Sequence, residues 1–487
     1  MAAIEGDMVG DARLKSGGMI RGLGNLIGAR AVGIVFTLVQ VKISTNYLGP
    51  QGYGILSAAL VFIGTFEAFT ELGIGTIVVR RVAGGADLHR TVGVAQALSL
   101  AFSAVLIAAA LLFGWLGYRG TGAFEGIAIL AVGLIGTAWA ATYNSVAQTR
   151  DDFAGISWAD ISGRAVSLAI VLIAVLSHWS ITAFFLAQLA APLLRGAISH
   201  WWGRRHGTFR PHFDFAEMRS LLMEALPLTY ITIIAGLYFQ ISGVMIAQLS
   251  TLVQAGAYNF AYRIAMNVNV IGMAISAVLV ARYASAAAES EEKYRSVLSL
   301  SMSMVLTLVL PIGFLLWPFN ADIIRLLGSE KFVELSTVPL ALLWISTAAS
   351  MMGTIVSTAL VAGHTQRFLA ILNTCTLLLN VLLNAVAIPR WQATGAAAAL
   401  IVTELVGVTF ALVRLGCRSP GFWPWRDLCC LVGCLLLALA VEYLTAPYLY
   451  WVPRGLLVAG VFFAGAYLTR VITPARVREL SEGSLPT

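Results

Sequence analysis

The sequence has few charged residues, and this shortage defines its class. Only 11% of its 487 residues are Asp, Glu, Lys or Arg, against about 25% in a typical soluble domain. Hydrophobic residues make up 59%, and the mean hydropathy is +0.84. Such a composition is typical of a chain that crosses a lipid bilayer many times. The sequence therefore predicts an integral membrane protein.

Basic tracts, disulfide frameworks and catalytic motifs are also missing. The formal net charge is +7, but no run of Lys and Arg exceeds two residues, which excludes a nucleic-acid partner. No phosphate-binding loop and no pairing of a nucleophile with a base is present, so we expect neither a cofactor nor an enzyme. The cysteines lie in or beside apolar segments, without the spacing of a metal site. They are Cys375, Cys417, Cys429, Cys430 and Cys434.

Long apolar stretches are what the chain does have. Fourteen stretches are long enough to cross a hydrocarbon core about 30 Å thick, which takes about 17–25 residues. We therefore predict an all-α integral membrane protein with about fourteen transmembrane helices. The predicted spans are residues 20–46, 54–79, 91–116, 123–147, 157–177, 181–202, 220–248, 254–280, 297–317, 337–362, 368–388, 393–413, 427–445 and 453–472.

The positions of the 31 Lys and Arg residues predict the orientation of these spans, because basic loops are retained on the cytoplasmic side. With the N-terminus inside, 21 of them fall in inner segments and five in outer loops. Both termini are therefore expected to be cytoplasmic. In the largest outer loop, residues 321–332 are predicted to form a short interfacial helix that Gly328 can cap.

Five basic residues fall inside the predicted spans, where a charge near a helix centre costs about 2.5–3.5 kcal/mol. They are Arg30, Lys42, Arg164, Arg195 and Arg263. A cavity lined by such cations would suit an anionic substrate, above all a phosphate or a diphosphate. All five are therefore candidate substrate ligands.

Three of these cations also have a structural interpretation. Arg164 can pair with Asp160, one helical turn away, near the cytoplasmic end of its span. Lys42 is close enough to the outer interface to snorkel into it. Arg195 lies about two turns from the inner end, so inward snorkelling and a cavity role are both open.

Arg30 and Arg263 favour the cavity, because they lie deep in their spans and have no acid three or four residues away. A faint internal repeat relates their two hairpins, since the string at 256–261 echoes the one at 54–59. The offset of six spans predicts two parallel halves. We hypothesise that these two arginines together hold a diphosphate.

Two acids raise the question of ion coupling. Glu67 and Glu71 lie one turn apart in the second predicted span, where a buried carboxylate could titrate. Coupling to protons or sodium is one interpretation. Hydrogen bonding to a neighbouring helix, or pairing with Arg30, is the other.

Three segments resemble a known family. Residues 48–54 (LGPQGYG), followed by 71–81 (ELGIGTIVVRR), are similar to the start of polysaccharide transporters, the Wzx-type flippases of lipid-linked oligosaccharides. Residues 321–328 (ADIIRLLG) resemble an outer connection of the same family. The resemblance implies the fold of the multidrug/oligosaccharidyl-lipid/polysaccharide superfamily, with two six-helix lobes around a central cavity, two additional C-terminal helices and an alternating-access mechanism.

This resemblance implies a domain organisation around two lobes of six helices. A cytoplasmic N-terminal segment precedes the first lobe, a cytoplasmic linker joins the lobes, and two helices and a cytoplasmic tail follow the second. The corresponding ranges are 1–19, 20–202, 203–219, 220–413, 414–472 and 473–487.

The resemblance also gives weight to the two deep arginines. Residues 29–33 are similar to the Arg-x-x-Gly of the first helix in related lipid II flippases, and residues 260–264 to their cavity-facing arginine in the eighth. Their second Arg–Asp pair is missing, because Phe36 and Thr37 stand in its place, which implies a polyprenyl-linked glycan other than lipid II. The acid that many polysaccharide flippases carry in the seventh span is absent at 242–243, which puts ion coupling at that position in doubt.

Three functions remain open. A flippase would move a polyprenyl-diphosphate-linked oligosaccharide from the inner to the outer leaflet for surface polysaccharide biosynthesis, and it requires cations. A multidrug or cation antiporter would need a net acidic cavity, and the five intramembrane cations argue against it. A membrane polymerase or glycosyltransferase would need a catalytic outer loop, but the only adjacent acid pair, at 151–152, falls in an inner loop.

We favour a monomeric flippase in the bacterial inner membrane. Its partners would be the lipid-linked oligosaccharide and membrane lipids, and it could act alongside a polysaccharide polymerase and glycosyltransferases. Which glycan it carries, and what drives transport, stay open.

Overall fold

The computed structural model describes residues 2–70, 73–150, 152–363 and 365–476, and the side chains of these residues except 2–27, 29–31 and 153. Every regular element in this part of the chain is a helix. Twelve of the described helical segments are long and apolar enough to cross a membrane, which confirms the predicted class. The chain divides into two compact units, Met1–Val244 and Met245–Thr487.

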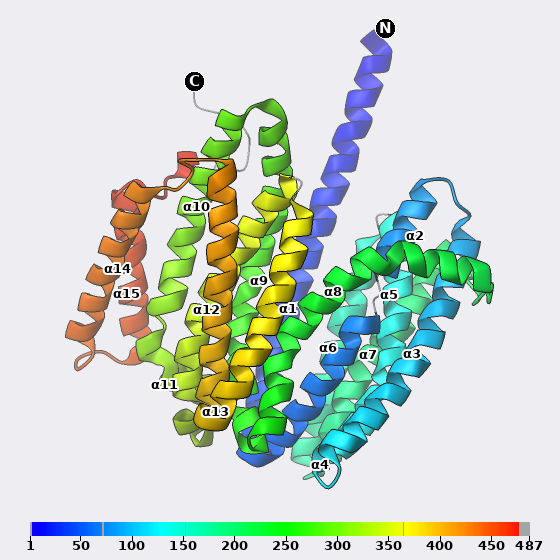
Figure 1. The fold of residues 1–487 in the computed structure, drawn as a ribbon, viewed down its shortest axis with the longest axis horizontal. Helices are drawn as coiled ribbons and strands as arrows, with labels where there is room; N and C mark the ends of the chain where they lie inside the picture. The colour runs from blue at the N-terminus through cyan, green and yellow to red at the C-terminus, as the bar shows by residue number, and fades with distance from the viewer. Residues whose placement is uncertain (1, 71–72, 151, 364, 477–487) are drawn as a thin grey trace. The chain divides into compact units, whose positions relative to one another are not determined.

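Unit 1 begins with an apolar helix that is far too long for one crossing. This helix is interrupted at Gly49, whose φ of 65° suits glycine and few other residues, and Pro50 follows without an amide proton. The elements, shown in Figure 1, are α1 (Ala2–Thr70), α2 (Ile74–Ala83), α3 (Leu88–Tyr118), α4 (Gly122–Ala131), α5 (Gly133–Thr149), α6 (Phe153–Leu176), α7 (Ile181–Gly203), the short 3₁₀ turn η1 (Arg204–His206) and α8 (Phe215–Leu249), which ends just beyond the unit.

Unit 2 contains a second over-long helix, which is interrupted at Gln392 with a φ of 50°. Its elements are α9 (Leu252–Glu289), α10 (Glu291–Phe314), η2 (Trp317–Phe319), α11 (Asn320–Leu327), η3 (Glu330–Phe332), α12 (Val333–Ala362), α13 (Gln366–Arg418), α14 (Trp425–Thr445) and α15 (Trp451–Leu468).

The two interruptions bear on the number of spans. The apolar segments Val32–Ala83 and Gln366–Arg418 contain 52 and 53 residues, more than twice the about 20 residues that one crossing of a hydrocarbon core takes. Each is long enough to cross twice, and each interruption falls between two predicted spans. The count of fourteen itself stays a prediction, because the structure counts twelve helical segments.

The span predicted at 123–147 is confirmed by one apolar helical segment, Gly122–Thr149, in which Val132, with helical φ and ψ, separates α4 from α5. The two compact units meet between Val244 and Met245, inside α8, whereas the predicted lobes and the linker 203–219 stay a prediction. The first turns of α8 pack on unit 1, where Leu221 and Ala225 share a buried core with α2, α3 and α5. Figure 1 shows this part of α8 running across the ends of those helices.

The short helix predicted in the 318–337 loop is confirmed as α11. The Gly328 amide donates to the Ile324 carbonyl at 2.7 Å and ends the helix. Ile324 is buried, whereas Arg325 is exposed, so the helix presents one apolar face to unit 2. Asn320, at its start, accepts a hydrogen bond from Trp344 Nε1 at 2.8 Å, which anchors α11 to α12.

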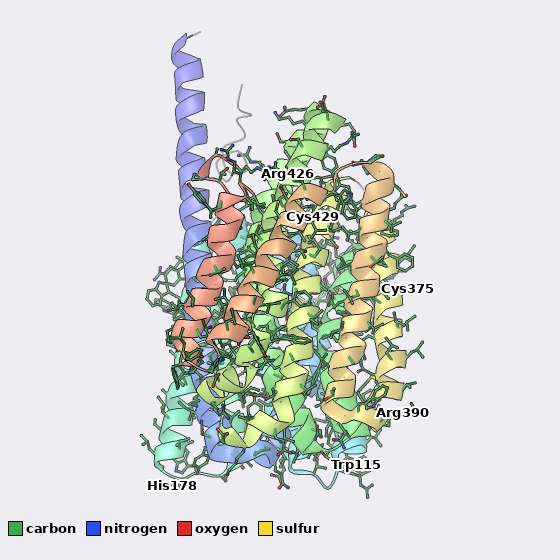
Figure 2. All side chains as sticks on the ribbon, turned by 90° about the vertical axis from the view of Figure 1, so that its left-hand side faces the viewer. Trp115, His178, Cys375, Arg390, Arg426 and Cys429 are labelled. Carbon is green, nitrogen blue, oxygen red and sulfur yellow. The ribbon has the colours of Figure 1, made fainter. Side chains whose placement is uncertain are left out.

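Within each unit the helices alternate in direction. Figure 2 labels Trp115 and His178 at the same end of unit 1, one near the end of α3 and the other just after α6. In unit 2 it labels Arg390 and Arg426 at opposite ends, with Cys375 between them. Consecutive crossings therefore return the chain from one end to the other, as the predicted spans require.

Helices α5 and α7 pack through glycines, backbone against backbone. A Cβ on Gly136 would lie 2.5 Å from the carbonyl oxygen of Pro192, and a Cβ on Gly196 would lie 2.8 Å from that of Gly136. Gly163 of α6 makes the same approach to Ala191, at 2.8 Å. Small residues at such contacts let membrane helices approach closely. They hold α5, α6 and α7 together.

We predict that Gly136→Ala lowers the melting temperature of the purified protein. The added methyl group meets backbone atoms that cannot move aside, and overpacking of this kind costs about 1–3 kcal/mol. Gly433→Ala is the matched control, because nothing lies within 4 Å of a Cβ there, and it should melt like the native protein. Equal melting of the two variants in a thermal-shift measurement in detergent would show that the α5–α7 contact does not require glycine.

Candidate functional site

Three of the charges predicted inside the spans of unit 1 meet at one place. Asp160 and Arg164 lie one turn apart on α6, and Arg164 Nε is 3.0 Å from Asp160 Oδ2. Arg195 reaches the same carboxylate from α7, with its Nη1 3.9 Å from Asp160 Oδ1. The predicted Asp160–Arg164 pair is thus confirmed. We call these three residues the α6–α7 cluster.

Neighbouring helices supply neutral partners to the cluster. Arg164 Nη1 donates to the hydroxyl of Thr37 on α1 at 2.9 Å, and that hydroxyl donates to the Gly33 carbonyl. Arg195 Nη2 donates to Thr137 Oγ1 of α5 at 3.3 Å. Gly33 makes room for the guanidinium, because a Cβ there would lie 3.0 Å from Arg164 Nε.

The cluster is partly buried. Its side chains keep 40% (Arg164), 34% (Arg195) and 30% (Asp160) of their exposure. Because α6 spans Phe153–Leu176, Arg164 stands half-way along it. Charges at this depth of an apolar helix are expensive unless they are compensated. One carboxylate compensates two guanidiniums, so one positive charge is left over.

The surplus charge comes with unused hydrogen-bond donors. Arginine carries five N–H groups in a planar fork that fits the oxygens of a phosphate. Among the described residues, Arg195 Nε is buried and has no hydrogen-bond partner. A buried donor without a partner costs free energy that an incoming acceptor would recover. The α6–α7 cluster can therefore bind an anion.

The other predicted residues of unit 1 lie on α1 or just beyond it. Lys42 is half-buried, five residues after Thr37. Glu67 is half-buried, and its carbonyl accepts from Thr70 at 2.8 Å. Arg30 is in α1, but its side chain lies outside the described ones, and Glu71 lies outside the described residues altogether. Their predicted roles stay predictions.

Arg263, the predicted ligand of unit 2, is half-buried in α9. Its carbonyl accepts a hydrogen bond from Asn267 Nδ2 at 2.8 Å. In the described part of the chain no acidic side chain lies within ion-pair distance of its guanidinium. The sequence likewise has no acid three or four residues from Arg263. The role of Arg263 as a ligand stays a prediction.

Two acidic residues that fall in predicted spans form ion pairs near the ends of their helices. Glu224 of α8 binds Arg80 and Arg81 of α2, the latter at 2.6 Å. Glu442 of α14 faces Arg454 of α15 at 3.7 Å, and both keep only 13% of their exposure. These ion pairs join neighbouring helices, and an arginine engages each of the two carboxylates.

Further ion pairs join α3 to the start of α8. Arg90 contacts Glu217 at 2.6 Å and Asp214 at 3.4 Å. The Glu217 amide, with that of Ala216, donates to Asp214 and holds the pKa of its carboxyl below the usual value. Asp214 therefore stays ionised at the N-terminus of α8, where a negative charge is favourable.

Sequence reasoning missed the neutral members of the site. Thr37 and Thr137 are ordinary helix residues until packing sets them beside an arginine. Gln40 was missed too, and its Nε2 donates to Ser167 Oγ at 3.0 Å, joining α1 to α6 next to the cluster. The only available signal was their polarity inside apolar spans. Thr37 stands where the resemblance predicts an Arg–Asp pair that this sequence lacks. In the structure, the Arg–Asp pair of α6 lies beside Thr37.

The sequence matches a known protein family. The family described as "Polysaccharide biosynthesis protein" matches residues 19–281, more than half of the chain. The chain belongs to this family. The MatE family matches residues 227–386 of the chain. No curated protein matches the sequence significantly. The predicted family and superfamily are thus confirmed.

Solved structures of transporters share the fold. "Lipid II flippase MurJ, inward closed conformation" superposes with a TM-score of 0.76 at 14% identity, over 93% of this chain and 99% of that one. An inward-facing multidrug resistance MATE family transporter gives 0.62 at 14% identity, over 79% and 95%. A transporter of the same superfamily from Pyrococcus furiosus, reported with a binding pocket of reverse polarity, gives 0.55 at 13% identity, over 81% and 95%. At these identities the likeness shows the fold alone.

We predict that Asp160→Ala destabilises this polysaccharide biosynthesis protein more than Arg164→Ala or Arg195→Ala does. Loss of the shared carboxylate leaves two guanidiniums without a counter-charge, whereas loss of one arginine leaves the carboxylate paired with the other. With partial exposure taken into account, the difference should be on the order of 1 kcal/mol. Melting temperatures in detergent measure it.

Asp322→Ala is the control for this comparison. Asp322 pairs with an exposed arginine at 3.4 Å, so its loss should change the stability by about 0.5 kcal/mol or less. If either arginine variant melted as low as Asp160→Ala, the carboxylate would not be the shared centre of the cluster.

Proposed function

We propose that the protein is a flippase that moves a polyprenyl-diphosphate-linked oligosaccharide from the inner to the outer leaflet, by alternating access, for surface polysaccharide biosynthesis. The observation that carries this proposal is the α6–α7 cluster. Two guanidiniums share one carboxylate in membrane-crossing helices of a polysaccharide biosynthesis protein. The surplus positive charge fits a diphosphate, which accepts charge-assisted hydrogen bonds from planar arginine forks.

In this proposal Arg164 and Arg195 bind the diphosphate within unit 1. Arg30, Lys42 and Arg263 are further proposed ligands. Glu67 and Glu71 are kept as candidates for ion coupling. The protein would lie in the bacterial inner membrane as a monomer with both termini cytoplasmic, and would receive its substrate from glycosyltransferases and deliver it to a polymerase.

A multidrug or cation antiporter is the second candidate, favoured by the MatE match at residues 227–386 and by the MATE transporters that share the fold. A cation substrate would have to meet a carboxylate that is free to receive it. Asp160 is already held by two arginines. The surplus charge of the cluster therefore supports the flippase over the antiporter.

We predict that deletion of the gene removes surface polysaccharide and leaves lipid-linked oligosaccharide accumulated at the inner leaflet, because the head group is too polar to cross the bilayer unaided. Surface glycan and lipid-linked intermediates are quantified in the deletion strain, with the intact gene restored on a plasmid as the control. Normal surface glycan together with new sensitivity to cationic drugs would replace the flippase with the antiporter.

We further predict that Arg195→Ala and Arg164→Ala reduce glycan export at matched membrane abundance, and that the Lys variants restore it in part. Each guanidinium supplies charge-assisted hydrogen bonds worth about 1.5–3 kcal/mol, so its loss should weaken binding about tenfold to a hundredfold. Lysine keeps the charge but not the fork. The same pairs of variants test Arg30 and Arg263.

Arg325→Ala is the control for the export series. Arg325 lies in α11, is exposed, and pairs with Asp322 and Glu330. Its loss should leave export unchanged. Normal export by all four alanine variants in the spans would show that these arginines stabilise the fold and do not bind substrate.

A further inference from the structure

The two arginines of the α6–α7 cluster are held unequally. Arg164 is fixed, with a 3.0 Å bond from its Nε to Asp160 and a 2.9 Å bond from its Nη1 to Thr37. Arg195 is held loosely, at 3.9 Å from the other oxygen of Asp160 and 3.3 Å from Thr137. A separation of 3.9 Å is an ion pair without a hydrogen bond. Of the two guanidiniums, Arg195 is the one that is free to change partner.

The remaining donor of Arg195 points to the same conclusion. Its Nε is buried, and no described residue accepts a hydrogen bond from it. Arg164, in contrast, uses its Nε in the bond to Asp160 and lies against Gly33, where no side chain competes for the space. An oxyanion with several oxygens could engage the Nε and an Nη of Arg195 together. The negative charge of Asp160, 3.9 Å from Arg195 Nη1, repels such an oxyanion and weakens its binding to Arg195.

We propose that Asp160 is an internal counter-anion that the substrate displaces from Arg195. This inference rests on the proposed function, and it adds that the ligand is a lipid-linked phosphate or diphosphate that competes with a carboxylate of the protein. When the ligand arrives, Arg195 exchanges Asp160 for the ligand oxygens, while Arg164 keeps its short bond to Asp160. When the ligand leaves, Asp160 pairs with Arg195 again. The carboxylate thus weakens binding and assists release.

The exchange also sets a selectivity. Two anions compete for one guanidinium, and the one with more charge and more acceptor oxygens has the advantage. A diphosphate exceeds a single carboxylate on both counts, whereas a neutral glycolipid does not. A neutral lipid should therefore leave the Asp160–Arg195 contact in place. Asp160 is a specificity-determining residue in this scheme and does not itself bind the substrate.

The test is the affinity of the purified full-length protein for farnesyl diphosphate, measured by isothermal titration in detergent. Asp160→Asn keeps the size of the side chain and removes the competing charge, so the dissociation constant should fall about tenfold or more. Arg195→Gln should raise it. In the double variant the gain from Asp160→Asn should disappear, because it acts through Arg195. Farnesol, the uncharged alcohol, should bind none of the proteins more tightly after the Asp160 change.

Asp152→Asn is the matched control. This carboxylate precedes α6 and accepts from Trp202 Nε1 at 2.7 Å, away from the cluster, and its loss should leave the affinity unchanged. Asp160→Ser provides a second neutral variant if Asp160→Asn does not fold. A purely structural role for Asp160 predicts weaker or unchanged binding in both variants.

The outcomes separate this inference from the proposed function. Binding by the native protein without tightening in the Asp160 variants overturns the counter-anion and leaves the flippase in place. Tightening that persists in the double variant overturns the exchange at Arg195. Absence of binding by the native protein and by every variant overturns both the diphosphate substrate and the inference that rests on it.

Discussion

The sharing of one carboxylate by two guanidiniums is the interaction on which unit 1 depends. A charge inside an apolar helix is costly, and Asp160 lowers that cost for Arg164 and Arg195 at once. The contact requires α6 and α7 to lie close together. Gly163 provides this, since a Cβ there would meet the backbone of α7 at Ala191. Packing by small residues and compensation of charge therefore act on the same pair of helices.

Most of the fold could be predicted from hydropathy, because a bilayer requires apolar stretches of a fixed length. Helices α3, α6 and α7 begin and end within a few residues of their predicted spans. Hydropathy does not show where the two compact units meet. The division inside α8 depends on the core that Leu221 and Ala225 complete, and such a core is a property of the packed unit.

The candidate site could be predicted only in part. Asp160 and Arg164 are four residues apart, so helical geometry alone brings them together. The contact of Arg195 with Asp160, and those of Thr37 and Thr137 with the arginines, join helices that lie far apart in the sequence. No local pattern encodes them.

The fold by itself does not decide what is carried, because both a lipid II flippase and a multidrug transporter share it. The choice rests on charge balance at named residues. A site for organic cations needs a carboxylate with spare negative charge, and Glu224, Glu442 and Asp160 are each engaged by arginines. A site for a lipid diphosphate needs guanidiniums with spare donors, which Arg195 has. In the flippase that we propose, the phosphates of the substrate would balance the positive charge in excess at the cluster.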